Sequence, residues 1–165
     1  MPESPPILRA AVAADAAAIG ALILDLAPDF APQPSAALPP AFTASLAPER
    51  LAQRIDDPDH RFWVAERDGR ILGVIALARG THVLYLFVDR SCHRGGVARA
   101  LWERALAQTA AAQTWTVNAS VYAVPVYRRF GFEPTGPAEL RNGLRCVPMR
   151  RDRPADHAQP PRQTG

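Results

Sequence analysis

Cysteine is scarce in this sequence, and the placing of the two cysteines excludes two kinds of site. Cys92 and Cys146 lie far apart and form neither a CxxC pair nor the spacing of a zinc site. The sequence therefore indicates no metal centre and no dithiol redox motif. It predicts free thiols in a reducing compartment.

Long apolar runs are also missing. No stretch reaches the ~20 apolar residues of a membrane span, and residues 1–6 lack the basic start and apolar centre of a signal peptide. The net charge of +3 is spread over the chain without a basic patch, which does not favour a nucleic-acid partner. We therefore expect a cytoplasmic protein that binds neither membrane nor nucleic acid.

The chain has no internal repeats, and its 165 residues with 48% hydrophobic content predict one domain with an ample core. We expect that domain to occupy residues 1–150. The polar, proline-rich residues 151–165 are typical of a disordered tail.

Periodicity and turn residues predict the order of the elements. The expected strands are 7–12, 61–66, 71–78, 83–88, 115–117 and 144–149. The expected helices are 16–26, 48–55, 96–112 and 122–130, the first of them capped by Asp15. Loops are expected at 28–48, which is rich in proline and alanine, and at 133–143. Gly73 indicates a bulge within its strand.

The most informative stretch runs from His82 to Leu101. An apolar strand is followed by His93-Arg94-Gly95-Gly96-Val97-Ala98 and then by a helical pattern. Paired glycines allow close approach of a ligand, and the helix N-terminus offers free N–H groups and a positive dipole end. With the cation of Arg94 these features predict an anion cradle, most naturally for a pyrophosphate.

The glycine pair alone is weak evidence, because it matches neither GxGxxG nor GxxxxGK[ST]. Taken in isolation, this stretch is better explained by a plain strand–turn–helix connection without a ligand.

A second stretch, from Trp115 to Phe132, predicts a strand and then a short helix. Pro125 fits the first turn of that helix, and Gly131 fits its C-terminal left-handed position. Phe132 then returns to the core.

Together the two stretches make residues 7–150 similar to the GCN5-related N-acetyltransferase (GNAT) family. That family has a Q/R-x-x-G-x-G/A loop for the coenzyme A pyrophosphate, which Gly96 and Ala98 match and in which His93 replaces Gln or Arg. The family also has a tyrosine shortly before a Gly-Phe pair, which Tyr127 matches. It often has an asparagine seven residues before the tyrosine, where this chain has Ser120, with Asn118 nearby.

The resemblance implies an α/β (α+β) fold with a mixed, mostly antiparallel central sheet flanked by helices. It also implies acetyl-CoA as co-substrate, with no metal. The implied coenzyme-binding residues are Phe87, Val88, His93, Arg94, Gly95, Gly96, Val97, Ala98, Arg99, Asn118 and Ser120. In the family, the region that corresponds to 28–48 borders the acceptor pocket.

The implied chemistry is direct attack of a primary amine on the thioester. Tyr127 is then the candidate acid that protonates the leaving thiolate. The alternative role for Tyr127 is structural, as a buried tyrosine that satisfies one hydrogen bond. Backbone N–H groups at an irregularity of the strand 83–88 would hold the oxyanion. That strand has no acid to serve as base; His82, Glu66 and Glu139 are candidates, and none is preferred.

Three hypotheses follow: an N-acetyltransferase acting on a small-molecule or protein amine, a non-catalytic acyl-CoA sensor, and a binder of another phosphate ligand such as a nucleotide. The acceptor stays open among an antibiotic, a polyamine, an amino acid and a protein N-terminus. Members of the resembled family often form homodimers, which the sequence does not reveal here.

Overall fold

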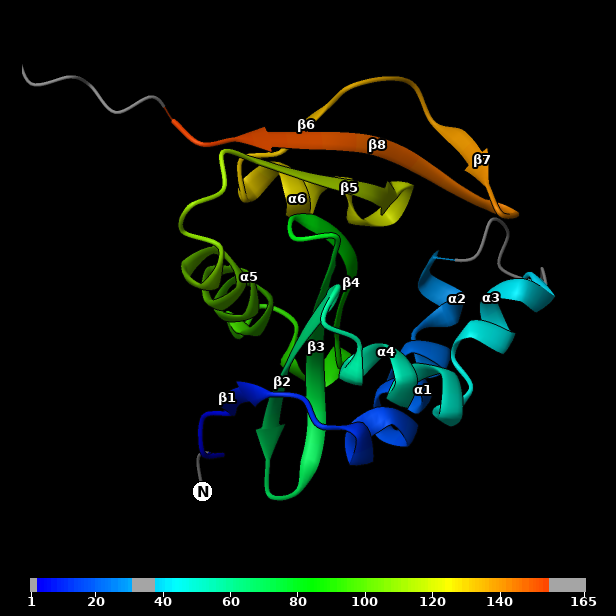
Figure 1. Ribbon diagram of the computed structural model, residues 1–165, viewed down its shortest axis with the longest axis vertical. Helices are drawn as coiled ribbons and strands as arrows, with labels where there is room; N and C mark the ends of the chain where they lie inside the picture. The colour runs from blue at the N-terminus through cyan, green and yellow to red at the C-terminus, as the bar shows by residue number, and fades with distance from the viewer. Residues whose placement is uncertain (1–2, 31–37, 155–165) are drawn as a thin grey trace, which may run out of the picture.

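One mixed sheet organises the protein, which is described for residues 3–30 and 38–154 by a computed structural model (Figure 1). The described strands pair in the order β1-β2-β3-β4-β5-β8-β6, and β7 also pairs with β8. Among these pairs β4 and β5 are parallel, and the others are antiparallel. The mixed, mostly antiparallel sheet predicted from the sequence is confirmed.

The strands are β1 (Ile7–Ala10), β2 (His60–Arg67), β3 (Arg70–Ala78), β4 (His82–Val88), β5 (Thr114–Ser120), β6 (Glu133–Pro134), β7 (Glu139–Arg141) and β8 (Leu144–Asp152). The α-helices are α1 (Ala16–Asp25), α2 (Ala27–Phe30), α3 (Pro40–Ser45), α4 (Pro48–Asp56), α5 (Val97–Gln108) and α6 (Val124–Arg129). Short 3-10 turns lie at Ala13–Asp15, Arg90–Cys92 and Val121–Ala123.

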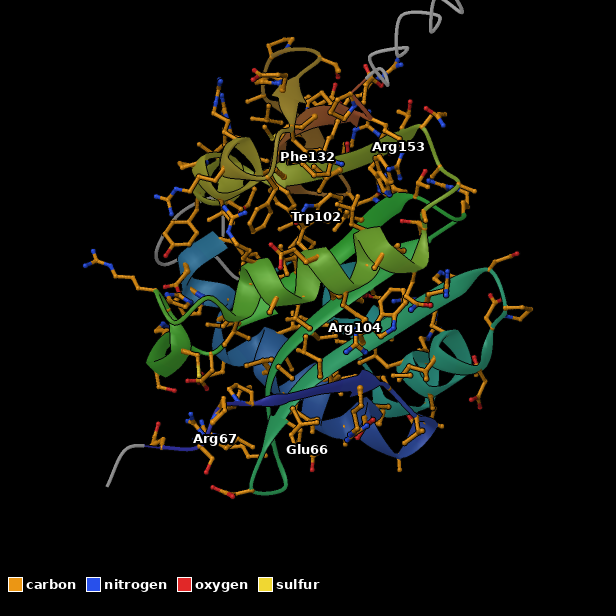
Figure 2. The ribbon with its side chains drawn as sticks, turned by 90° about the vertical axis from the view of Figure 1, so that its left-hand side faces the viewer. Glu66, Arg67, Trp102, Arg104, Phe132 and Arg153 are labelled. Carbon is orange, nitrogen blue, oxygen red and sulfur yellow. The ribbon has the colours of Figure 1, made fainter. Side chains whose placement is uncertain are left out.

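Helices cover both faces of the sheet, so its central strands are buried on both sides. On β2, Trp63 and Ala65 join the core beneath α5, while Phe62 and Val64 join the core beneath α1 and α4. Figure 2 shows α5 lying across the sheet. The side chains of β2 therefore alternate between two faces, and each face contributes to a separate core.

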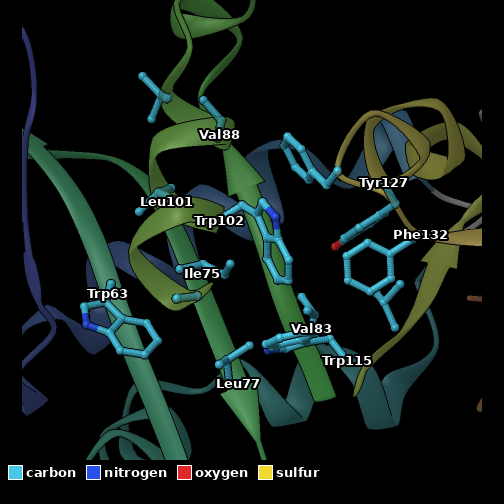
Figure 3. Packing of buried hydrophobic residues seen from close by; sticks show 14 of the residues in the cluster. Trp63, Ile75, Leu77, Val83, Val88, Leu101, Trp102, Trp115, Tyr127 and Phe132 are labelled. Atoms are coloured by element: carbon cyan, nitrogen blue, oxygen red, sulfur yellow. The ribbon is translucent and has the colours of Figure 1, made fainter. Parts of the chain in front are cut away.

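An aromatic cluster fills the core beneath α5. The ring centroid of Trp102 lies 5.2 Å from that of Phe132 and 6.2 Å from that of Trp115, both edge-to-face (Figure 3). Trp115 and Phe132 have no exposed surface. These contacts attach α5 to the half of the sheet formed by β5 and β8.

Several predicted ends are wrong. The strand expected at 7–12 ends at Ala10, and the strand expected at 115–117 runs from Thr114 to Ser120. Trp115 explains two further differences. The helix expected to reach residue 112 ends at Gln108, because the Thr109 hydroxyl donates to the Ala105 carbonyl (2.8 Å) and accepts from the Trp115 indole (3.0 Å). The last strand continues past Met149 to Asp152, since Arg151 and Arg153 both stack on Trp115. The tail therefore does not begin at 151, and residues 155–165 lie outside the described residues.

Both expected loops contain regular structure. The segment 28–48 includes the end of α2 and all of α3, whose first turn contains Pro40, although residues 31–37 lie outside the described part. The segment 133–143 includes β6 and β7, which pair with β8. Short strands without strong alternation carry little signal in a sequence.

Asp15 occupies the predicted N-cap position of α1, but its carboxylate bonds elsewhere. It accepts the N–H of Val12 (2.8 Å) and the guanidinium of Arg9 (2.8 Å), which also donates to Glu66 (2.6 Å). Hydrogen bonding to Arg9 holds the pKa of Asp15 below its usual value. Asp15 therefore connects the start of α1 to β1 and β2.

Gly73 sits next to the predicted bulge and beneath α5. The pairing of β2 with β3 shifts register between Ala65 and Glu66, so Leu72 is the additional residue. A Cβ atom on Gly73 would lie 3.0 Å from Leu101 Cδ1 and 3.3 Å from Val97 Cγ1. The missing side chain lets the first turns of α5 approach β3 closely.

We predict that Gly73→Ala destabilises the protein by about 1 kcal/mol, because Leu101 is fully buried and has little room to yield. Urea unfolding would measure the change. Gly136→Ala is the matched control, since its new Cβ would make an ordinary 3.6 Å contact with Pro148. Equal stability of the two variants would contradict the close packing of α5.

Candidate functional site

The parallel strands β4 and β5 pair over only two residues before they separate. The pairs are His82 with Thr116 and Val83 with Val117. On its other side β4 shifts register against β3 after Val83, which makes Leu84 an additional residue. The second half of β4 and the end of β5 therefore line a gap in the sheet, and the irregularity predicted for the strand 83–88 lies at its start.

A cavity of about 640 Å³ opens beside this gap. That volume is typical of sites for small molecules and cofactors. Most residues predicted to bind coenzyme line it: Phe87, Val88, His93, Arg94, Gly96, Val97, Ala98, Arg99 and Ser120. The cavity thus joins the end of β4, the glycine loop, the start of α5 and the end of β5.

Two of the predicted residues lie elsewhere. Gly95 does not line the cavity, and its N–H donates to the Cys92 carbonyl (3.1 Å). Asn118 lines a second, smaller cavity on the other side of the gap. The hydroxyl of Ser120 accepts the N–H of Ala123 (3.2 Å) and so caps the turn that leads into α6.

The glycine loop has the backbone of an anion cradle. Arg94 and Gly96 both have left-handed backbones, with φ of 69° and 80°. The first hydrogen bond of α5 runs from the Ala100 N–H to the Gly96 carbonyl (2.9 Å). Residues 97–99 come before Ala100 in the chain, so their N–H groups have no acceptor within the helix.

His93 fixes this loop to the strand before it. Its Nε2 lies 2.9 Å from the carbonyl oxygen of Val88, so the ring carries a proton on Nε2 and donates. His93 takes the place of the Gln or Arg of the resembled loop. In this chain its side chain bonds the end of β4, and His93 also lines the cavity.

Arginines supply positive charge around the cavity. Arg94, Arg99 and Arg129 line it, and the Arg99 guanidinium lies 5.3 Å from the ring centre of Phe130. The one carboxylate on its described wall, Asp29, accepts from Arg90 (3.0 Å). The remaining charge of the described lining favours an anionic ligand.

Tyr127 stands where the two cavities meet, and it lines both. Its ring packs edge-to-face on Phe132 at 5.5 Å (Figure 3). Burial raises the pKa of Tyr127, so the phenol stays protonated at neutral pH. Within the described residues no hydrogen bond holds its hydroxyl, which leaves that hydroxyl available to a ligand.

None of the three candidate bases lines either cavity. Nδ1 of His82 bonds the Thr116 hydroxyl at the far end of β4 (2.8 Å), and burial lowers the pKa of His82. Glu66 is bonded to Arg9 and Glu139 to Arg141, both at 2.6 Å. The structure brings no predicted base near Tyr127.

The second cavity has a volume of about 130 Å³ and shares part of its wall with the first. The shared residues are Phe30, Leu86, Phe87, Ser120, Ala123 and Tyr127. A molecule lying in the first cavity can therefore meet a molecule in the second beside Tyr127.

Sequence reasoning missed the outer walls of both cavities. Phe30 and Phe42 come from α2 and α3, and Arg145 and Cys146 come from β8. The two phenylalanines were detectable, since they interrupt a stretch of proline and alanine that the resemblance places at the acceptor pocket. Nothing in the local sequence of β8 marks Arg145 or Cys146.

Comparisons with known proteins agree with this geometry. The family described as "Acetyltransferase (GNAT) domain" matches residues 26–153. The chain therefore belongs to the GNAT acetyltransferase family. No match was found among curated protein sequences.

Solved structures of similar fold come from several organisms. A GCN5-related N-acetyltransferase from Rhodopseudomonas palustris is 24% identical with a TM-score of 0.70, covering 92% of this chain and 98% of that one. The PaiA N-acetyltransferase from Thermoplasma acidophilum, solved with coenzyme A, is 13% identical with a TM-score of 0.73 (91% and 100% covered). A ribosomal-protein-alanine N-acetyltransferase from Brucella melitensis is 19% identical with a TM-score of 0.65 (88% and 99% covered). At these identities the likeness establishes the fold.

Within residues 3–30 and 38–154, no helix has the length and apolar character needed to cross a bilayer. The same residues contain no group of three or more His, Cys, Asp or Glu side chains that could hold a metal ion.

We predict that Arg94→Gly stabilises the free protein by about 0.5–1 kcal/mol, because glycine adopts the left-handed backbone without steric cost. The same change should weaken coenzyme A binding, since a cation leaves the cavity. Urea unfolding and calorimetry would measure the two effects.

Arg79→Gly is the control for this prediction. Arg79 also has a positive φ, 51°, but it lies in the turn between β3 and β4 and lines neither cavity. It should gain stability and keep its affinity for coenzyme A. Equal affinity in both variants would remove Arg94 from the cradle.

Proposed function

We propose that the protein is an N-acetyltransferase that transfers the acetyl group of acetyl-CoA to a primary amine by direct attack in a ternary complex. The observation that carries this proposal is the gap between β4 and β5. It connects an anion cradle at one end to Tyr127 and a second cavity at the other. The coenzyme A in the Thermoplasma acidophilum structure of the same fold supports the choice of coenzyme.

The cradle fits the pyrophosphate of coenzyme A. Backbone N–H groups at the start of α5 would bind its oxygens, and Arg94 would add a cation. A Cβ built on Gly96 meets no atom within 4 Å, so the space beside the loop is open to a ligand. The pantetheine arm would then follow Phe87 and Val88 into the gap, beside Ser120 and Asn118.

The reaction needs a place for each proton and electron pair. The amine nitrogen forms a bond to the acetyl carbon, and the carbon–sulfur bond then breaks. Backbone N–H groups of β4 at the irregularity after Val83 would hold the oxyanion. The Tyr127 hydroxyl would donate to the departing thiolate, while the proton of the amine leaves to water.

Deprotonation of the amine has no assigned base. A primary amine such as that of lysine has a pKa of about 10.4 in water and must lose its proton before it attacks. The described lining of the second cavity holds no carboxylate and no imidazole. We propose that an apolar pocket lowers the pKa of the bound amine instead.

The same lack of a base favours one alternative, a non-catalytic acyl-CoA-binding sensor on this fold. Tyr127 argues against a sensor, since it lines both cavities and no described residue bonds its hydroxyl. Release of free thiol from acetyl-CoA in the presence of a panel of amines separates the two. Tight binding without thiol release would favour the sensor.

We predict that Gly96→Glu abolishes binding of coenzyme A, because a side chain and a negative charge would both enter the cradle. Isothermal calorimetry would measure the loss. Gly69→Glu is the matched control. Gly69 has nearly the same backbone, with φ of 77° against 80°, and open space around it, but lies in the hairpin between β2 and β3. If Gly96→Glu keeps its affinity, the loop does not bind the coenzyme.

We also predict that Tyr127→Phe slows turnover by about a hundredfold while coenzyme affinity and stability change little. No residue of the described part of the chain bonds this hydroxyl, and proton donation comes late in the reaction. Single-turnover thiol release and calorimetry would test this. Unchanged turnover, with chemistry rate-limiting, would exclude Tyr127 from the mechanism.

A further inference from the structure

The second cavity has the size and walls of a pocket for one ring. An apolar cavity of about 150 Å³ holds a benzene molecule, and this one measures about 130 Å³. Aromatic side chains form one wall: the ring of Phe30 lies 5.8 Å from Phe42 and 5.3 Å from Phe87. Leu84, Val117 and Leu144 add aliphatic surface. An apolar group of about ring size would be well accommodated here.

The described lining of this cavity carries charge of one sign, and the nearest carboxylate, that of Glu139 opposite Cys146, is bonded to Arg141 (2.6 Å). That lining includes one charged side chain, Arg145, which is exposed and forms no ion pair within the described residues. A second guanidinium stands just behind the lining, where Arg54 donates to the hydroxyl of Tyr85 (2.6 Å).

From this arrangement we infer that the acceptor is a free α-amino acid with an apolar side chain of about ring size. Its carboxylate would pair with Arg145, and its side chain would enter the aromatic cavity. Its amine would then lie toward the shared wall, where Tyr127 and the thioester meet. The inference rests on the proposed acetyl transfer and names the substrate class of that same site.

The same charges disfavour polycations. A polyamine or aminoglycoside would bring several ammonium groups against two guanidinium groups, while the nearby carboxylate of Glu139 is already bonded to Arg141. For an amino acid the same guanidinium groups are favourable. Nearby positive charge and loss of water both favour the neutral form of its amine, which is the form that attacks. The step is then balanced without a protein base: the nitrogen bonds to the acetyl carbon as the carbon–sulfur bond breaks, the amine proton goes to water, and the thiolate of coenzyme A takes a proton from Tyr127. The Tyr127 phenolate then regains a proton from water.

The test compares two substrates that differ only in the carboxylate. L-Phenylalanine and L-phenylalaninamide share the amine and the ring, and spermidine serves as the polycation. Thiol release would be measured with the wild-type chain, Arg145→Gln and Arg150→Gln. Arg150 is the matched control, since it lies on the same strand, is exposed, and is already paired with Asp152 (2.8 Å) outside both cavities.

We expect Arg145→Gln to raise KM for phenylalanine by roughly fivefold or more and to leave KM for the amide unchanged. Arg150→Gln should change neither. Comparing each variant with the wild type on each substrate cancels the difference in basicity between the two amines.

Three results would overturn the inference: an equal effect of Arg145→Gln on both substrates, no effect on either, or a preference for spermidine over phenylalanine. Calorimetry would measure acetyl-CoA binding by the same preparations. It distinguishes a wrong acceptor class from a wrong proposed function. Acetyl-CoA binding with acetylation of spermidine or the amide alone would contradict only the acceptor class. Absence of acetyl-CoA binding would contradict the proposed function itself.

Discussion

The parallel pairing of β4 with β5 ends after two residue pairs, and the rest of the site depends on that ending. If the pairing continued, the backbone of β4 would be satisfied along its length and no channel would cross the sheet. Pairing with their outer neighbours keeps β4 and β5 apart. β3 pairs with β4 through an irregularity after Val83, and β8 pairs with β5 over its whole length. Each strand is therefore stable without its parallel neighbour, and the gap stays open between them.

The packing of α5 places the anion cradle at the mouth of this gap. Gly73 allows the helix to approach β3, and the aromatic cluster around Trp102 ties it to the β5 side. The helix start thus has a fixed position relative to both walls. The loop before it carries Arg94 in a left-handed backbone, a conformation that is unfavourable for arginine and that serves the cradle.

The sequence predicted those parts of the site that are built from one continuous stretch. The loop His93–Ala98 and the helix after it follow from local spacing, and Tyr127 follows from the family resemblance. The structure brings the loop, apart from Gly95, the start of the helix and Tyr127 to one cavity. The outer walls did not follow, because Phe42 and Arg145 reach the site through long-range packing of α3 and β8. The predicted end of the last strand was wrong for the same reason, since only the folded protein places Arg151 and Arg153 on Trp115. The candidate bases failed because a residue type suited to catalysis says nothing about its distance from the reacting atoms.

A thermal shift with acetyl-CoA, coenzyme A and ATP tests the central claim most directly. The claim is that the gap and its cradle form one site for a pantetheine-bearing pyrophosphate. We predict a clear rise in melting temperature with either coenzyme form, equivalent to about 2.7 kcal/mol at a hundredfold excess over the dissociation constant. ATP, which has the phosphates but no pantetheine arm, should give a much smaller rise. An equal rise with ATP, or no rise with saturating coenzyme, would contradict the account.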